Sequence, residues 1–215
     1  MADLCLGTVQ FGMKYGINNR QGQPSMNDSV EMIKYAVDNG VKYIDTARAY
    51  GDAELVIGEY NKIYGVPKDI KIISKLRPNI IEADTKDVNS LIRDEFESSL
   101  KRMGVDKLNG YLLHTPEYIY NQNILDALLN LKEEKMVENI GVSIYDLKEG
   151  EQAIKTGIID YIQLPYSYLD QRGIRTGFIK KAKEHGIKIF TRSAFLQGLV
   201  TVSYTHLTLP TTPYV

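Results

Sequence analysis

Two kinds of segment alternate along the chain, and this alternation limits the folds that it can adopt. Short runs rich in β-branched and other apolar residues are followed by longer stretches with helical spacing. Seven runs have this character: residues 4–7, 41–45, 70–75, 110–114, 139–143, 161–164 and 188–191. Most are almost continuously apolar, as is typical of parallel strands buried on both faces. Strict alternation of strands and helices predicts a parallel α/β fold.

Helix signals fill the stretches between these runs. Ser25 and Asp28 form a capping-box-like start for a helix that ends near Gly40. Apolar residues on one face predict further helices over residues 88–103, 124–131 and 174–182.

The alternation fits either a closed barrel or an open, doubly wound sheet. An open dinucleotide-binding sheet normally has the spacing Gly-x-Gly-x-x-Gly after its first strand, whereas residues 7–12 read GTVQFG. Polar residues end or directly follow many of the runs: Asp45, Lys75, His114, Ser143, Gln163 and Arg192. A β/α barrel builds its active site from the carboxyl ends of several strands. We therefore predict a (β/α)8 TIM barrel.

Composition argues against several classes of function. The chain is 43% hydrophobic with a formal net charge of −1, and its basic residues are scattered, so we expect no nucleic-acid partner. No apolar run approaches the ~20 residues that span a bilayer, so we expect no membrane segment. Residues 1–4 carry no basic targeting segment, and we expect a cytoplasmic location. Cys5, the only cysteine, is expected to be a buried core thiol.

Three polar residues end consecutive runs and are expected to face one mouth of the barrel. Lys75 follows an apolar segment and would be costly to bury without a partner, and Asp45 is the natural partner one strand away. His114 ends the next run, and Tyr50 lies in the loop after Asp45. A neighbouring ammonium group is expected to lower the pKa of Tyr50. Tyr50 would then donate a proton to a developing alkoxide, with a hydride supplied by a cofactor.

Each of these residues also has a simpler interpretation. Asp45 and Lys75 can form a purely structural ion pair, and His114 can be a structural histidine. Tyr50 alone carries no information, since the chain has 15 tyrosines. Because all four residues occur around three successive strand ends, a catalytic role is favoured over a purely structural one.

Together these residues resemble the aldo-keto reductase family over residues 4–200. Residues 45–51 read DTARAYG and match the family's most specific motif, with Glu54-x-x-x-Gly58 following and Lys75 and His114 completing a catalytic tetrad. The resemblance implies hydride transfer from NADP(H), with NADPH preferred, to an aldehyde or ketone. It implies that Tyr50 is the general acid, that the Asp–Lys pair tunes it and that His114 orients the carbonyl. Residues 7–17 resemble bacterial members linked to sugar metabolism, a cue for a sugar-derived carbonyl substrate.

The resemblance also assigns the cofactor site, and it implies no metal ion. The residues expected to bind the cofactor are Gly7, Thr8, Asp45, Ser143, Gln163, Arg192, Ser193, Phe195, Gln197 and Gly198. Ile144 and Ser167 stand where the family often has Asn, and Arg192 replaces an aromatic residue that stacks on the nicotinamide. The basic residues that hold the 2′-phosphate in the family are not in this sequence. The expectation of NADP rather than NAD therefore rests only on the cofactor that the family usually uses.

The last segment fits neither element type. Residues 202–211 resemble an in-frame translation of the transposase adapter used in sequencing-library preparation, and an irregular natural tail is the alternative. We expect residues 1–200 to form a partial barrel that lacks its eighth βα unit, and residues 201–215 to be a non-native tail. Such a product is expected to be unstable or weakly active. Two other functions stay open: a non-catalytic nicotinamide-binding protein or inactive fragment, and an aldolase with a Schiff base on Lys75.

Overall fold

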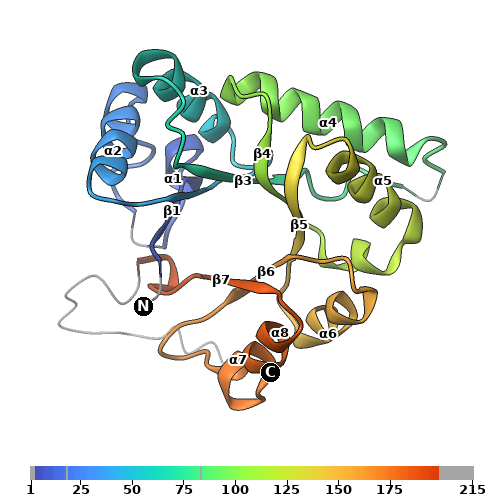
Figure 1. Ribbon diagram of the computed structural model, residues 1–215. Helices are drawn as coiled ribbons and strands as arrows, with labels where there is room; N and C mark the ends of the chain where they lie inside the picture. The colour runs from blue at the N-terminus through green and yellow to red at the C-terminus, as the bar shows by residue number, and fades with distance from the viewer. Residues whose placement is uncertain (1–2, 18, 83, 199–215) are drawn as a thin grey trace, which may run out of the picture.

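The computed structural model of the chain describes residues 3–17, 19–82 and 84–198. A single seven-stranded parallel sheet lies at its centre, with the strands paired in chain order (Figure 1). The strands are β1 (Cys5–Gly7), β2 (Tyr43–Asp45), β3 (Lys71–Leu76), β4 (Leu108–Leu113), β5 (Val137–Ser143), β6 (Tyr161–Pro165) and β7 (Lys188–Arg192). Each strand lies within or overlaps one of the predicted runs, and the sheet curls into an incomplete (β/α)8 barrel, which confirms the predicted fold class.

The helices lie around the outside of this sheet (Figure 1). They are α1 (Val9–Gly12), α2 (Met26–Asp38), α3 (Ala53–Tyr64), α4 (Val88–Met103), α5 (Gln122–Glu133), α6 (Leu147–Thr156), α7 (Arg172–Arg175) and α8 (Phe178–Glu184), with 3-10 turns η1 (Pro116–Tyr120) and η2 (Leu196–Gly198). The predicted cap of α2 is confirmed, because the Ser25 side chain accepts a hydrogen bond from the Asp28 backbone N–H. The single helix predicted over residues 174–182 is wrong. Gly177 adopts a left-handed φ of 76°, which separates α7 from α8.

Apolar side chains fill the inside of the curl. Tyr43, Ile73, Leu112, Tyr161 and Phe190 form one buried cluster in the barrel interior. The rings of Tyr43 on β2 and Phe190 on β7 meet edge to face, with centroids 5.4 Å apart. Strands far apart in the sheet order therefore touch across the interior, as they do in a barrel.

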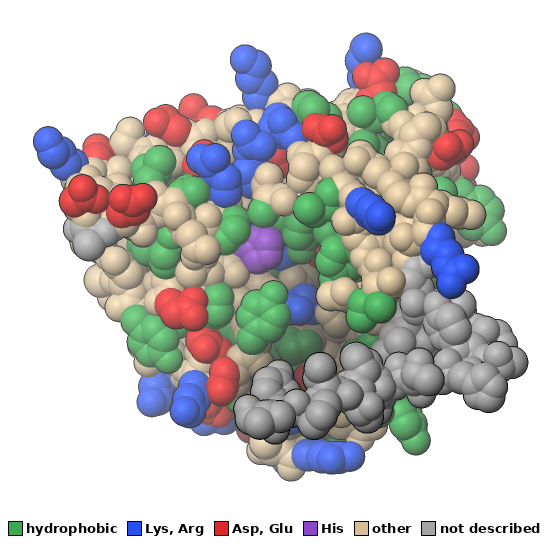
Figure 2. All heavy atoms as spheres, turned by 180° about the vertical axis from the view of Figure 1, so that it is seen from behind, with side chains coloured by type: hydrophobic (Ala, Val, Ile, Leu, Met, Phe, Trp, Pro, Cys, Tyr) green, Lys and Arg blue, Asp and Glu red, His purple; other side chains and the backbone are tan. Residues whose placement is uncertain are grey.

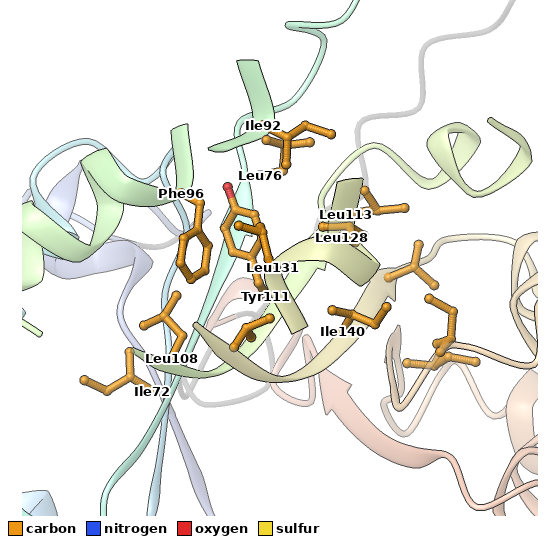
Figure 3. Packing of buried hydrophobic residues seen from close by; sticks show 14 of the residues in the cluster. Ile72, Leu76, Ile92, Phe96, Leu108, Tyr111, Leu113, Leu128, Leu131 and Ile140 are labelled. Atoms are coloured by element: carbon orange, nitrogen blue, oxygen red, sulfur yellow. The ribbon is translucent and has the colours of Figure 1, made fainter. Parts of the chain in front are cut away.

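A larger core lies between the sheet and its helices. Figure 3 shows part of it, where Leu108, Tyr111 and Leu113 of β4 pack against residues of α4 and α5. The Phe96 ring of α4 meets the Tyr111 ring with centroids 4.9 Å apart. This layer holds the carboxyl ends of the central strands in place.

Within the described residues, β1 and β7 each have a neighbouring strand on one side only. The prediction that Cys5 is a buried core thiol is wrong, because this residue lies exposed on β1 at the edge of the sheet. The predicted non-native tail, residues 201–215, lies outside the described residues. No helix in the described part of the chain is long and apolar enough to cross a membrane.

Close packing of α3 on α4 generates a test of the fold. A Cβ added at Gly58 would lie 2.2 Å from the Arg102 carbonyl oxygen, so Gly58→Ala must push the two helices apart. We expect a loss of about 2 kcal/mol or more in the free energy of unfolding, measured by urea denaturation. Gly7→Ala is the control, since a Cβ there meets no atom within 4 Å. Equal stability of the two variants would contradict this packing.

Candidate active site

A buried ion pair forms the centre of the site. Lys75, on β3, has no exposed side-chain surface, and its Nζ lies 2.7 Å from Asp45 Oδ1 at the end of β2. The same Nζ donates to the Thr46 carbonyl oxygen over 2.8 Å. Burial acts to lower the pKa of Lys75, but the Asp45 carboxylate and the Tyr50 hydroxyl outweigh it and the pKa is raised. Lys75 is therefore an ammonium group at neutral pH, as the sequence predicts for a paired lysine.

Tyr50 lies beside this ammonium group. Its hydroxyl is 3.5 Å from Lys75 Nζ, and the Nζ lies 4.9 Å from the centre of the phenol ring. The sequence-based expectation of a lowered pKa is wrong in its net direction. Burial raises the pKa of Tyr50 by more than the charge of Lys75 lowers it. Tyr50 is consequently a protonated phenol at neutral pH.

His114 completes the group directly after β4. Its ring meets the Tyr50 ring edge to face, with centroids 5.7 Å apart and planes at 88°. Burial and the charge of Lys75 lower the pKa of His114 to about 4, so the imidazole is neutral at pH 7. Its Nδ1 is buried and has no hydrogen-bond partner within the described residues. The structure thus brings together all four residues that the sequence predicts to be catalytic.

Two further predicted residues join the same network. Gln163 in the middle of β6 donates from Nε2 to Asp45 Oδ1 over 2.9 Å. Ser143 at the end of β5 donates from Oγ to Gln163 Oε1 over 3.3 Å. Both side chains are buried and present amide and hydroxyl groups, which suit an amide ligand such as a nicotinamide carboxamide.

Gly7 and Thr8 reach the network through the backbone. Gly7 pairs in register with Asp45, and the N–H and hydroxyl of Thr8 each donate to the Asp45 carbonyl oxygen over 3.0 Å. Thr8 therefore anchors the end of β2. The structure places both residues beside Asp45 at the end of β2.

The predicted residues at the end of β7 and after it are less closely joined to the network. Arg192 donates from Nη2 to the Ile144 carbonyl oxygen over 3.2 Å, and its guanidinium carbon lies 4.2 Å from the centre of the Tyr145 ring. Ser193 and Gln197 have positive φ values of 60° and 57°. Phe195 is 63% exposed, and Gly198 ends η2. No hydrogen bond or ion pair joins Phe195 or Gln197 to the four central residues in the described part of the chain.

Sequence reasoning missed the stacking of Arg192 on Tyr145. Nothing distinguishes Tyr145 from the other tyrosines in the sequence, because it lies on a loop without a motif. Two other aromatic residues have structural roles: Phe11 is buried in the core, and the Tyr118 hydroxyl accepts a hydrogen bond from the Ile81 N–H. Figure 2 shows a hollowed face on which a histidine and basic side chains lie among hydrophobic ones.

A sequence profile of the Aldo/keto reductase family matches residues 3–211 of the chain. The chain belongs to this family. Its sequence is 28% identical to that of the aldo-keto reductase YhdN of Bacillus subtilis, over 80% of this chain and 54% of that protein. It is 27% identical to the NADH-specific methylglyoxal reductase of Escherichia coli, over 80% of this chain and 57% of that protein. The chain therefore spans little more than half the length of these curated relatives.

Solved structures of aldo-keto reductases share the fold. A putative aldo-keto reductase from Pseudomonas aeruginosa superposes with a TM-score of 0.74 at 25% identity, over 92% of this chain and 75% of that one. The NADPH complex of an aldo-keto reductase from Klebsiella pneumoniae has a TM-score of 0.69 at 25% identity, over 90% of this chain and 64% of that one. The second of these structures thus holds a nicotinamide cofactor on the shared fold.

The low pKa of His114 predicts a loss of stability in mild acid. The unfolded chain takes up a proton on His114 below its ordinary pKa of 6.5, whereas the folded chain does so only near pH 4. The contribution is therefore fully present above pH 6.5, and it is lost as the pH falls towards 4. It amounts to at most about 3 kcal/mol.

Urea unfolding at a series of pH values measures this loss. His114→Gln removes the titrating group while keeping a polar side chain of similar size, so its free energy of unfolding should fall less steeply with acid. The same pH dependence in both proteins would show that His114 does not carry the effect.

Proposed function

We propose that this chain reduces an aldehyde or ketone to an alcohol with a hydride from NADPH, and that Tyr50 is the general acid. The observation that carries the proposal is the Tyr50 hydroxyl, 3.5 Å from a fully buried Lys75 ammonium that is paired with Asp45. When bound, the cofactor supplies the hydride to the carbonyl carbon. As the carbonyl π bond breaks, its oxygen takes the hydroxyl proton of Tyr50, and the phenolate that remains regains a proton from solvent.

The charges around Tyr50 suit this proton transfer. The raised pKa keeps the phenol protonated before the reaction, and Lys75 stabilises the phenolate that forms. Asp45 keeps the ammonium in place. His114, neutral at pH 7, would donate an N–H to the substrate oxygen and orient it. The buried Nδ1 without a partner fits a site that a ligand completes.

The donor set of Ser143 and Gln163 supports a nicotinamide carboxamide beside Asp45. We propose NADP(H), on the family resemblance and on the NADPH complex of the Klebsiella pneumoniae relative. Because the relative from Escherichia coli is NADH-specific, activity with NADH should be measured beside activity with NADPH. That relative is named for methylglyoxal, so a small carbonyl compound, including a sugar-derived one, is the proposed substrate class.

A cytoplasmic location and a partial barrel over residues 1–200 are further proposals.

The aldolase alternative has less support. A Schiff base requires an unprotonated lysine, whereas the raised pKa and the hydrogen bonds of Lys75 to Asp45 and Thr46 hold it as an ammonium ion. Borohydride trapping with a carbonyl substrate distinguishes the two, because only an aldolase becomes labelled at Lys75. NADPH binding without turnover would favour the non-catalytic alternative.

Removal of the Tyr50 hydroxyl tests the acid directly. In Tyr50→Phe we expect kcat to fall by about 10²–10⁴, because the alkoxide loses its proton donor while the ring remains. NADPH consumption, followed by absorbance with methylglyoxal as substrate, gives the rate. Tyr120→Phe, at a residue that is 59% exposed on η1, is the matched control and should keep full activity. Comparable rates in the two variants would rule out Tyr50 as the acid.

The charge of Arg192 generates a prediction about the cofactor's redox state. A guanidinium that stacks near the nicotinamide disfavours the oxidised, cationic ring. Arg192→Tyr should tighten NADP⁺ relative to NADPH by roughly fivefold or more, the effect of about 1 kcal/mol for unit charges near 4 Å in water. Fluorescence titration gives both dissociation constants, and Arg192→Lys serves as the charge-retaining control. An unchanged affinity ratio in Arg192→Tyr would show that Arg192 lies away from the ring.

A further inference from the structure

The turn that carries Tyr50 is held from two sides. On one side, Arg102 of α4 donates from Nη2 to the Gly51 carbonyl oxygen over 2.8 Å. On the other, the Gly12 carbonyl oxygen accepts from the Asp52 N–H over 3.2 Å. Gly51 has a φ of 53°, and a Cβ there would lie 2.2 Å from the Gly12 oxygen. The turn fits this space only with glycine, so its position depends on its neighbours.

A buried carboxylate connects this turn to the strand of Lys75. Glu54, which is 1% exposed, accepts from Arg102 Nε over 3.2 Å. Its other oxygen accepts from the Ser74 hydroxyl over 2.8 Å, one residue before Lys75 on β3. Ser74 points out of the barrel and Lys75 points in, since successive side chains of a strand alternate. One carboxylate therefore braces β3 and, through Arg102, the residue after Tyr50.

We propose that Glu54 and Arg102 are positioning residues that set the distance between the Tyr50 hydroxyl and the Lys75 ammonium. The inference rests on the proposed role of Tyr50 as the acid. Neither residue touches the reacting atoms. They act by fixing Gly51 and Ser74, the chain neighbours of Tyr50 and Lys75.

Geometry explains why an arginine is needed. The guanidinium reaches Glu54 with Nε and Gly51 with Nη2 at the same time, whereas a lysine has a single nitrogen and can hold only one of them well. The Tyr50–Lys75 distance of 3.5 Å is long for a charge-assisted hydrogen bond. A small shift of the turn would break it, and misplacement by about 1 Å costs an enzyme up to 10²-fold in rate.

The test compares two arginines of the same helix. Arg102→Met and the milder Arg102→Lys remove the brace, while Arg93→Met removes a two-pronged ion pair between α4 and Glu134 at the end of α5. We expect kcat to fall about 10- to 100-fold in Arg102→Met and less in Arg102→Lys. The KM for NADPH should stay within twofold, and Arg93→Met should retain the kcat of the parent chain. If the substitutions only disturbed packing, both Met variants would lose stability, but kcat would not fall in the Arg102 variants alone.

A second readout does not depend on activity. The full chain is labelled with 3-fluorotyrosine, and the ¹⁹F signal that disappears in Tyr50→Phe is assigned to Tyr50. We expect this signal to shift in both Arg102 variants and to stay in place in Arg93→Met, because the phenol moves relative to the ammonium.

The outcomes separate the two proposals. A Tyr50 signal that responds identically to the Arg102 and Arg93 variants overturns the positioning role. So does an active parent chain whose kcat survives both Arg102 substitutions. An inactive parent chain in which only the Arg102 variants shift the Tyr50 signal leaves the positioning role standing and counts against the reductase function. If Arg102→Met fails to fold, the kcat and the Tyr50 signal of Arg102→Lys test the positioning role, since lysine keeps the charge and most of the volume.

Discussion

The structure is organised around one buried charge, the ammonium group of Lys75. A lysine with no exposed side-chain surface is unfavourable unless its charge is compensated, and here Asp45 and the Thr46 carbonyl supply the compensation. Asp45 in turn accepts from Gln163 on β6, and its backbone is held by Thr8 after β1. Residues of four strands or of their loops, β1, β2, β3 and β6, are therefore joined around a single ion pair.

The same charge lowers the pKa of both His114 and Tyr50, but it acts with burial at the first residue and against burial at the second. The result is a neutral imidazole next to a protonated phenol, which is the combination that an acid catalyst and an orienting donor need at neutral pH. Burial keeps Tyr50 protonated and His114 neutral before the reaction. The Lys75 ammonium then lowers the free energy of the Tyr50 phenolate that forms.

Much of this arrangement can be predicted from the sequence, because its signals are local. Continuous apolar runs mark strands buried on both faces, and polar residues at their ends mark the mouth. Other features depend on tertiary context. Cys5 has the same apolar sequence neighbours as a core residue, and only the strand order shows that β1 lies at an edge of the described sheet. Arg102 lies far along the chain from Glu54, so no motif joins them, and the pKa direction of Tyr50 follows from burial that no spacing encodes.

Position within the sheet also divides the site into two parts. Asp45, Lys75 and Gln163 lie on β2, β3 and β6, each with a neighbouring strand on both sides. Gly7 and Arg192, both proposed cofactor residues, lie on β1 and β7, the two edges of the described sheet. Strands paired on both sides are held by ladders of hydrogen bonds and by both cores, whereas edge strands open at lower free energy. The ion pair of Asp45 and Lys75 therefore lies on strands that are paired on both sides, whereas Gly7 and Arg192 lie on the strands at the two edges of the described sheet.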